Sequence, residues 1–331
     1  MKLAIVRAWY EGHPALLLLA PLSFLYATVA ALRRRFYRTG WLRVSRVQVP
    51  VVVIGNIAVG GTGKTPLTLA LVEQLRARGF RPGVVSRGYG GRASYPLRVT
   101  AETRPAEAGD EPVMLVRRTG VPLVVDPQRS RGAGFLLQQE ACDVILCDDG
   151  LQHYALARDV EIAVIDGSRG FGNGWLLPAG PLREPRRRLR SVDLVVVTGE
   201  GSAWPGAYVM SLAAGGMQPV AADESRLPPV PGSRVHAVAG IGNPERFFAQ
   251  LRAQGFDVVP HAFPDHHAYA SSDLAFADAL PVVMTEKDMV KCRALAAANW
   301  WYVPVRAELP GAFFEELFRR LELLRKSKNA G

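Results

Sequence analysis

Cysteine is scarce in this sequence: the 331 residues include only three, Cys142, Cys147 and Cys292. Their spacing fits neither a zinc site nor a disulfide framework, which argues against a disulfide-stapled secreted scaffold. Low-complexity tracts and internal repeats are also lacking, so a solenoid or a disordered chain is excluded. Hydrophobic residues make up 49% and charged residues 21%, as in a folded globular protein. The length is enough for two domains that each bury a core.

Acidic residues are too few to balance the basic ones, and the formal net charge is +10. The excess is concentrated in two arginine clusters, at residues 33–46 and 183–190. Such clusters suit nucleic acid, anionic lipid or a phosphorylated substrate, and a merely arginine-rich surface is the bland alternative. We expect no nucleic-acid partner, because the second cluster carries no stacking aromatics and the first adjoins an apolar run.

Residues 14–32 contain no charged side chain. As a helix this run would span roughly 28 Å, close to the ~30 Å hydrocarbon core of a bilayer. The arginines at 33–35 predict that the C-terminal side stays in the cytoplasm. A cleaved signal peptide is disfavoured because a triple arginine is awkward after a cleavage site. A helix that lies in the inner leaflet stays open, because Pro14 and Pro21 interrupt regular packing.

Short β-branched runs alternate with helical periodicity along the rest of the chain. This alternation predicts an α/β fold with a mainly parallel sheet covered on both faces. Strands are expected at residues 49–55, 83–86, 122–125, 143–147, 161–165, 193–198, 234–239, 257–260 and 281–285, and helices at 64–78, 110–118, 129–140, 244–254 and 310–324.

A proline-rich, aperiodic stretch at residues 221–233 interrupts the alternation. We therefore predict three parts: a membrane-associated helix with its basic flank over residues 1–40, a larger α/β domain over 41–225, and a smaller α/β domain over 226–331. A ligand between such domains would collect at the carboxyl ends of the strands.

The strongest local motif is the glycine-rich stretch GNIAVGGTGKT at residues 55–65. It lies between a predicted strand and a predicted helix, where backbone N–H groups and the helix dipole bind phosphate. Lys64 would reach the β- and γ-phosphates, and the Thr65 hydroxyl would bind Mg²⁺. The strict pattern is not met, since its first glycine is replaced by alanine. The predicted phosphate contacts are Ala58, Val59, Gly60, Gly61, Thr62, Gly63, Lys64 and Thr65.

An apolar strand that ends in Asp148 and Asp149 is the arrangement with which P-loop enzymes hold Mg²⁺. Two adjacent aspartates could also simply cap a loop. The N-K-x-D motif of many GTPases is absent, and Thr285-Glu-Lys-Asp288 resembles it only loosely. These motifs predict binding of a nucleoside triphosphate but do not distinguish ATP from GTP. They also fit a membrane-associated NTPase whose hydrolysis drives a conformational switch.

At this point the sequence resembles the lipid A tetraacyldisaccharide 4′-kinase family. The resemblance rests on motifs in the family's order across nearly the whole chain: GNIAVGGTGKTP at 55–66, SRGYGGR at 86–92, GDEP at 109–112, CDDGLQH at 147–153, PAGPLREP at 178–185, FPDHH at 263–267 and TEKD at 285–288. It implies a P-loop NTPase-type parallel sheet domain, a smaller C-terminal α/β domain and an N-terminal membrane helix.

The resemblance also implies the reaction and its setting. The γ-phosphate of ATP would pass, with Mg²⁺, to the 4′-hydroxyl of tetraacyldisaccharide 1-phosphate and form lipid IVA. The chain would work at the cytoplasmic face of the bacterial inner membrane, among membrane lipids and with no protein partner required. A switch-type NTPase would leave the GDEP and FPDHH motifs without roles.

A sugar hydroxyl loses its proton as it attacks phosphorus, so the reaction needs a base. In this family the acid of GDEP, here Asp110, is proposed as that base and is paired with a histidine of FPDHH. We favour His266, and His267 stays open. Catalysis is thus assigned to Asp110, His266 and Lys64, and the candidate acceptor contacts are Asn173, Arg183, Glu184 and His153.

Overall fold

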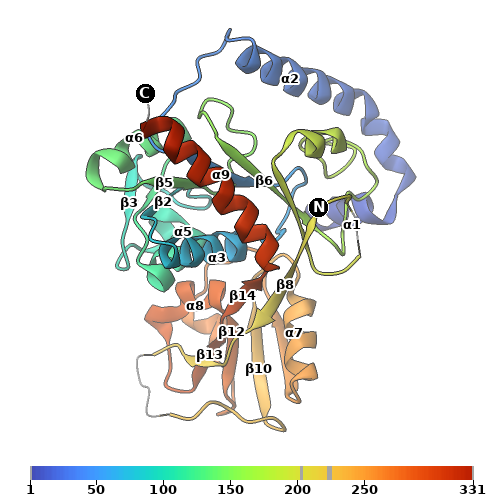
Figure 1. The fold of residues 1–331 in the computed structure, drawn as a ribbon. Coiled ribbons are helices and arrows are strands. Elements are labelled where there is room, and N and C mark those ends of the chain that lie inside the picture. The colour runs from blue at the N-terminus through green and yellow to red at the C-terminus, as the bar shows by residue number, and fades with distance from the viewer. Residues whose placement is uncertain (1, 202–203, 222–225, 330–331) are drawn as a thin grey trace.

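The computed structural model describes residues 2–201, 204–221 and 226–329 (Figure 1). In these residues the larger sheet has nine strands, parallel except for one antiparallel strand at each edge. Its order is β14 (Val305–Glu308), β8 (Tyr208–Ala214), β7 (Leu194–Thr198), β6 (Val160–Asp166), β1 (Val51–Gly55), β5 (Val144–Cys147), β2 (Pro82–Ser86), β4 (Leu123–Val125) and β3 (Leu97–Val99).

Both faces of this sheet are buried because its central strands are apolar on both sides. Alternate residues of β1 point to opposite faces. Val52 and Ile54 pack under α3 (Lys64–Ala77), α5 (Asp110–Thr119) and α9 (Gly311–Asn329). Val51 and Val53 pack under α6 (Arg129–Gln139). The carboxyl ends of the parallel strands are left free to form a site.

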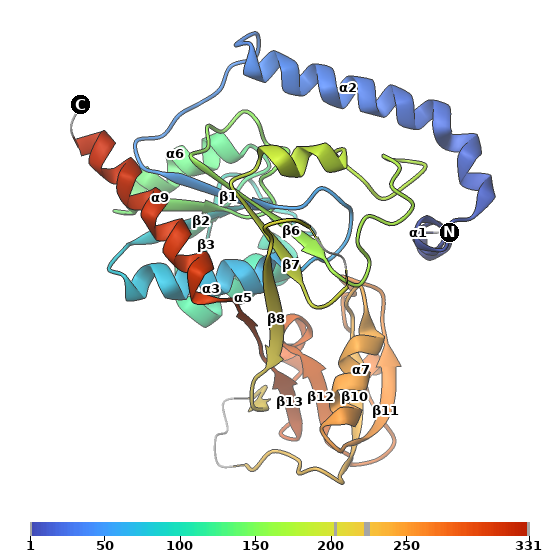
Figure 2. The ribbon, with the colours of Figure 1, turned by 45° about the vertical axis from the view of Figure 1, so that its right-hand side comes forward.

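A second sheet of five strands lies beside the first and is covered by α7 (Pro244–Ala253) and α8 (Glu286–Cys292) (Figures 1 and 2). Phe248 and Leu251 of α7 are fully buried against Val235 and Ala237 of the sheet. Its order is β11 (Asp257–Ala262), β10 (Arg234–Ala239), β12 (Val282–Thr285), β13 (Trp300–Val303) and β9 (Gln218–Pro219), with β9 antiparallel. The fold class predicted from the sequence is confirmed.

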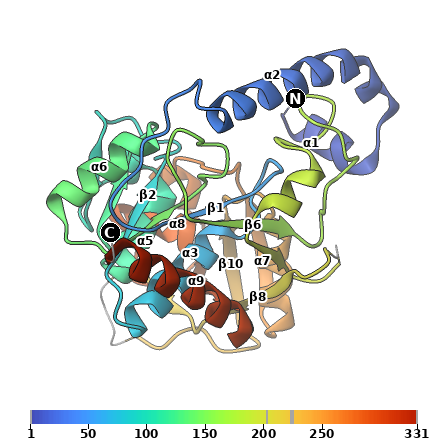
Figure 3. The same ribbon diagram turned by 45° about the horizontal axis from the view of Figure 1, so that its top comes forward.

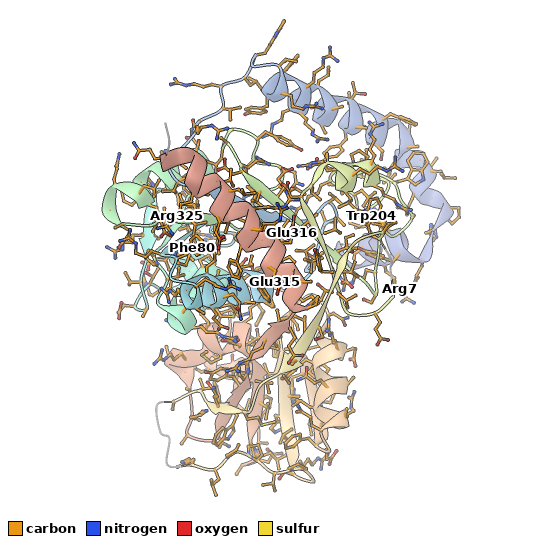
Figure 4. The ribbon with its side chains drawn as sticks, in the orientation of Figure 1. Arg7, Phe80, Trp204, Glu315, Glu316 and Arg325 are labelled. Atoms are coloured by element: carbon orange, nitrogen blue, oxygen red, sulfur yellow. The ribbon has the colours of Figure 1, made fainter. Side chains whose placement is uncertain are left out.

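The chain crosses between the two sheets more often than the sequence predicts. After the second sheet it returns to the first, where β14 pairs with β8 and α9 joins the core through Phe313 and Leu317. Figure 4 shows Phe80 and Arg325 together at the end of α9, with the guanidinium 5.7 Å from the ring centre. We expected residues 226–331 to form one unit, but their last strand and helix pack with the large sheet. Residues 222–225, beside the expected boundary, and 330–331 lie outside the described residues.

Three helical segments open the chain: α1 (Lys2–Glu11), the 3₁₀ helix η1 (Pro14–Leu19) and α2 (Ala20–Arg38). Figures 1 and 2 place α2 at the opposite end of the molecule from the second sheet, and Figure 3 shows α2 and α9 on opposite sides of β1 and β6. The stretch Pro14–Arg38 is long and apolar enough to cross a membrane, and 11% of its most apolar window is buried.

Candidate active site

The phosphate loop joins β1 to α3 and is held in shape by polar contacts. Gly63 caps α3 with φ +88°, and a Cβ there would stand 2.9 Å from the Thr198 hydroxyl. That hydroxyl donates to the carbonyl of Thr62 at 2.7 Å. The Asn56 amide donates at 3.3 Å to the Gly60 carbonyl and to the Thr62 hydroxyl. The left-handed backbone at Gly63 thus requires glycine and directs the start of α3 into the site.

Only part of the predicted phosphate loop faces open space. Residues 61–65 line a cavity of about 300 Å³. The earlier part pairs with a neighbouring loop instead: Val59 donates its N–H to the Pro181 carbonyl at 2.9 Å, and Ala58 bridges to Leu182. The predicted contacts of Ala58 and Val59 with phosphate therefore gain no support from the geometry.

The cavity above the phosphate loop is closed on its other side by the second sheet. Its walls include Leu69 and Met114 of the large sheet's helices, and Ile241, Phe247 and Lys287 from the smaller unit. Polar loop and basic groups at one end and apolar side chains at the other are typical of a ligand pocket. The pocket therefore depends on both sheets.

Asp149 stands at the carboxyl end of the large sheet, next to the phosphate-loop lysine. One carboxylate oxygen is 3.5 Å from Lys64 Nζ, and Arg183 Nη1 is 3.3 Å from both oxygens. Burial raises the pKa of Asp149, but the charges of Lys64 and Arg183 outweigh it and lower that pKa to about 2. Asp149 is thus a fixed anion in contact with two cations.

Asp148 lies deeper, with 2% of the residue exposed. It accepts a hydrogen bond from the Thr68 hydroxyl at 3.3 Å. Burial, with the nearby charge of Glu111, raises the pKa of Asp148 to about 7. The two adjacent carboxyl groups therefore differ in ionisation, and a cation in the site would favour the charged form of Asp148.

Asp110 begins α5 and meets a histidine from the second sheet. Nδ1 of His266 lies 3.1 Å from both oxygens of Asp110, whose exposed fraction is 5%. His267 points elsewhere, with Nε2 3.0 Å from Asp273 in its own loop. The geometry thus pairs Asp110 with His266, as the sequence favoured.

The pair is electrostatically coupled. Burial raises the pKa of Asp110, but the hydrogen bond from His266 and the charge of Lys287 lower it below the usual value. The same hydrogen bond raises the pKa of His266. Because the partners come from different sheets, the pair exists only while the two sheets are held together.

The predicted acceptor residues fall into different places. Arg183 lies between Asp149 and the side-chain oxygen of Gln152. Glu184 is 5% exposed and accepts hydrogen bonds from Gln152 and from Tyr154, at 2.8 and 2.6 Å. Arg183 is therefore available to a ligand, whereas Glu184 is taken up by its neighbours.

The other two predicted acceptor residues, Asn173 and His153, are influenced mainly by neighbouring groups of the protein. Asn173 donates to the carbonyl of Ala179 at 2.8 Å and accepts from the Trp175 N–H at 3.2 Å, so it fixes its own loop. Burial and the charge of Arg129 lower the pKa of His153 to about 3, so its imidazole is neutral.

Two basic residues of the site were not predicted from the sequence. Lys287, the lysine of TEKD, lies 3.7 Å from Asp110. Arg129 begins α6 with 1% exposure, and its Nε and Nη2 have no hydrogen-bond partner among the described residues. The sequence signal that could have found Arg129 was its position shortly after the strand β4, because the carboxyl ends of neighbouring parallel strands meet at one edge of the sheet.

A buried carboxylate–imidazole pair beside a cavity that begins at a phosphate loop suits attack by a hydroxyl group on phosphorus. Glu111 and Lys287, the neighbours of Asp110 and His266, line the same cavity as Lys64. The fold and the site therefore define a P-loop phosphotransferase.

Comparison with known proteins narrows this class. Residues 15–322 match the family described as tetraacyldisaccharide-1-P 4′-kinase, LpxK. A tetraacyldisaccharide 4′-kinase of Pseudomonas aeruginosa is 53% identical over 97% of both chains. One from Stenotrophomonas maltophilia is 55% identical over 96% of both. The crystal structure of LpxK from Aquifex aeolicus in complex with ATP is 27% identical, with a TM-score of 0.79, and covers 93% of this chain and 99% of that one.

The chain belongs to the tetraacyldisaccharide-1-phosphate 4′-kinase family. The predicted family and the prediction of a kinase are thereby confirmed. A switch-type NTPase, the competing interpretation, is not the activity for which this family is named.

Proposed function

We propose that this chain transfers the γ-phosphate of ATP to the 4′-hydroxyl of tetraacyldisaccharide 1-phosphate and so forms lipid IVA. The observation that carries the proposal is the buried contact of Asp110 with His266, beside the cavity that begins at the phosphate loop. The names of the relatives supply the acceptor, and the LpxK structure in complex with ATP supports ATP as donor.

The cavity fits a nucleotide triphosphate. The backbone of residues 61–65 and the N-terminus of α3 form its polar end, where phosphate oxygens would accept hydrogen bonds. Phe247 and Ile241 form an apolar part of the wall, suited to the rest of the nucleotide. Lys64 would reach the β- and γ-phosphates and offset the charge on the transferring group.

The residues present also fit Mg²⁺. Thr65, Asp148 and Asp149 offer hydroxyl and carboxylate oxygens, the hard donors that this cation prefers. Among the described residues no three His, Cys, Asp or Glu side chains are grouped as a metal site, which suits an ion that takes its remaining ligands from phosphates and water. When bound, Mg²⁺ would supply positive charge at the β- and γ-phosphates.

The step itself is a displacement at phosphorus. The 4′-oxygen forms a bond to the γ-phosphorus while its proton passes to a carboxylate oxygen of Asp110, and the bond from the γ-phosphorus to the β–γ bridging oxygen breaks to release ADP. His266 orients Asp110 through the contact with its Nδ1. Because Asp110 and its partner His266 come from different sheets, the complete site requires closure, which limits futile hydrolysis of ATP.

The acceptor has a suitable cavity beneath α2. This space of about 810 Å³ is bounded by the helix on one side and by the phosphate-loop domain on the other. Arg183 lines it and also contacts Asp149, so it connects the acceptor side to the metal carboxylates. The other basic residues of the lining would attract the phosphate already on the acceptor: Arg33, Arg34, Arg35, Arg38 and Arg187.

We further propose that α2 lies along the cytoplasmic surface of the inner membrane. Ser23 and Tyr26 bind the carbonyls of Leu176 and Arg183, so one side of the helix is attached to the body. The other side of α2, together with the preceding η1, exposes large apolar side chains, which favours burial in the interface over a crossing: Leu17 and Leu18 of η1, and Leu22, Phe24, Leu25, Val29 and Leu32 of α2.

The test is transfer of labelled γ-phosphate from ATP to tetraacyldisaccharide 1-phosphate in detergent with Mg²⁺, beside a Lys64→Ala variant. We expect a labelled bisphosphorylated lipid that falls by at least about 100-fold in the variant, because Lys64 carries charge stabilisation of the transferring group. Hydrolysis of ATP without labelled lipid would contradict the proposal.

A further inference from the structure

Lys287 is a buried cation surrounded by carboxylates from both sheets. Its ammonium nitrogen lies 3.0 Å from Asp265, 3.2 Å from Glu111 and 3.7 Å from Asp110. Asp110 and Glu111 begin α5 of the large sheet, whereas Asp265 and Lys287 belong to the smaller one. Only 16% of the Lys287 side chain is exposed. A lysine normally keeps its ammonium group in water, so burial here requires these partners.

The backbone beneath Lys287 is fixed by its neighbour Asp288, which is fully buried. Asp288 accepts hydrogen bonds from the Thr285 hydroxyl at 2.6 Å, from the Gly240 N–H at 2.9 Å and from the Tyr269 hydroxyl at 3.0 Å. These contacts tie the start of α8 to the end of β10 and to the loop that follows β11. That loop carries His266, so Lys287 and His266 are held in one unit.

We propose that Lys287 is a positioning residue for the phosphoryl transfer, which joins α8 to the start of α5 and holds the Asp110 carboxylate against His266. The inference rests on the proposed role of Asp110 as base. Lys287 also lines the cavity of the phosphate loop, so its ammonium group lies beside the region where the base must act. Its loss would remove one of the contacts between the sheets and leave Asp110 beside Glu111 and Asp265 without the cation that lies between them.

The charges around Asp110 predict how the loss would be observed. The groups that face it from the packed elements are Glu111 on α5, Asp265 and His266 after β11, and Lys287 and Lys291 on α8. Burial raises the pKa of Asp110, and His266 with the two lysines outweighs that effect. Burial by itself lowers the pKa of Lys287. The negative charges of Glu111, Asp110 and Asp265 together have a larger, opposite effect, so the pKa is raised and Lys287 stays charged. Without Lys287, the pKa of Asp110 would rise. Asp110 would then become protonated, and so unable to accept a proton, at a higher pH than in the wild type.

The experiment is the pH profile of kcat/KM for glycolipid phosphorylation by Lys287→Met and Lys287→Arg. For Lys287→Met we expect a fall of about 100-fold near neutrality, carried by kcat, with the KM for ATP close to wild type. The acid limb should move upward by about one pH unit, the effect of removing an opposite charge at this distance. Lys287→Arg should keep the limb near its wild-type position.

Arg118→Met is the matched control. Arg118 pairs with Glu286 at 2.9 Å and so joins the same two helices at the other end of α5, and among the described residues it makes no hydrogen bond or ion pair with Asp110. Arg118→Met should weaken the contact between α5 and α8 and so slow phosphoryl transfer, without changing the pH of the acid limb. Equal behaviour of the Lys287→Met and Arg118→Met variants, or a Lys287→Met variant altered only in the KM for ATP, would overturn the inference.

Asp110→Asn, measured in parallel, separates this inference from the proposed function. If Asp110→Asn loses transfer while the acid limb of Lys287→Met stays in place, only the role of Lys287 is wrong. If Asp110→Asn retains wild-type transfer, the proposed base is wrong as well.

Discussion

At the scale of single residues, surroundings rather than residue type decide what each carboxyl group does. Asp149 contacts Lys64 and Arg183 and stays ionised, whereas its neighbour Asp148 is buried behind it with a raised pKa. Asp110, although buried, is kept ionised by cations from the second sheet. Three aspartates within one site can therefore serve two purposes, cation binding and proton transfer.

The two adjacent histidines provide the sharpest comparison at this scale. His266→Ala removes the partner of Asp110 and should lower kcat by about 100-fold, with little change in the KM for ATP. His267→Ala removes the contact to Asp273 and the ring contacts with Phe263 and Tyr269, none of which involves Asp110, and should keep kcat within a fewfold of wild type. Steady-state phosphorylation of the glycolipid measures both, and a larger loss in His267→Ala would show that the pairing is the reverse of ours.

Sequence reasoning reached some of these residues and not others, for physical reasons. The phosphate loop and the strand-end aspartates are local patterns, so their positions follow from a few consecutive residues. The contact of Asp110 with His266 joins residues 156 positions apart, and only the family resemblance suggested it. Lys287 and Arg129 were not assigned to the site because neither the TEKD motif nor a position after a predicted strand shows that a basic residue is buried beside carboxylates. Glu184 lies in the PAGPLREP motif and Asn173 shortly before it, but the side chains of both bind their own neighbours.

At the scale of elements, buried parallel strands were the most predictable part. Each is a short apolar run, and all nine predicted strands and all five predicted helices are present within a few residues. The strands that were missed are β3, β8, β9, β13 and β14. Several of these are short or lie at sheet edges, where one side stays exposed and the apolar pattern weakens. The sequence also does not predict which sheet α9 packs against, because an amphipathic pattern does not specify the partner of a helix.

The element whose role is most open to test is α2. Leu25 of α2 and Leu18 of the adjoining η1 expose 61% and 82% of their surface. The double variant Leu18→Glu/Leu25→Glu should weaken binding to anionic phospholipid vesicles by at least about 10-fold, since two buried leucines would be replaced by charges. Affinity for ATP, measured by calorimetry, should not change, because the nucleotide cavity is lined by other elements.

A matched control comes from the opposite end of the molecule. Leu227 and Val230 expose 89% and 65%, and Leu227→Glu/Val230→Glu makes the same chemical change away from α2. This variant should bind vesicles as wild type does. Equal weakening in both double variants would mean that the contact with lipid is not specific to α2.

At the scale of the whole molecule, the site is an interface. The large sheet supplies the phosphate loop, the strand-end aspartates and Asp110, and the smaller one supplies His266 and Lys287. The cavity proposed for the acceptor is lined in part by α2, and Figure 1 places α2 at the opposite end of the molecule from the smaller sheet. An acceptor held at a membrane surface and a nucleotide held between two sheets would thus approach the same carboxyl ends of the strands from different sides.

The central claim is that Asp110 removes the proton of the attacking hydroxyl. Its most direct test is Asp110→Asn, with ATP affinity and phosphate transfer to tetraacyldisaccharide 1-phosphate measured on the same preparation. We predict that ATP affinity is retained while transfer falls by about 10²- to 10⁴-fold, the usual contribution of a general base. Near-normal transfer by this variant would contradict the account.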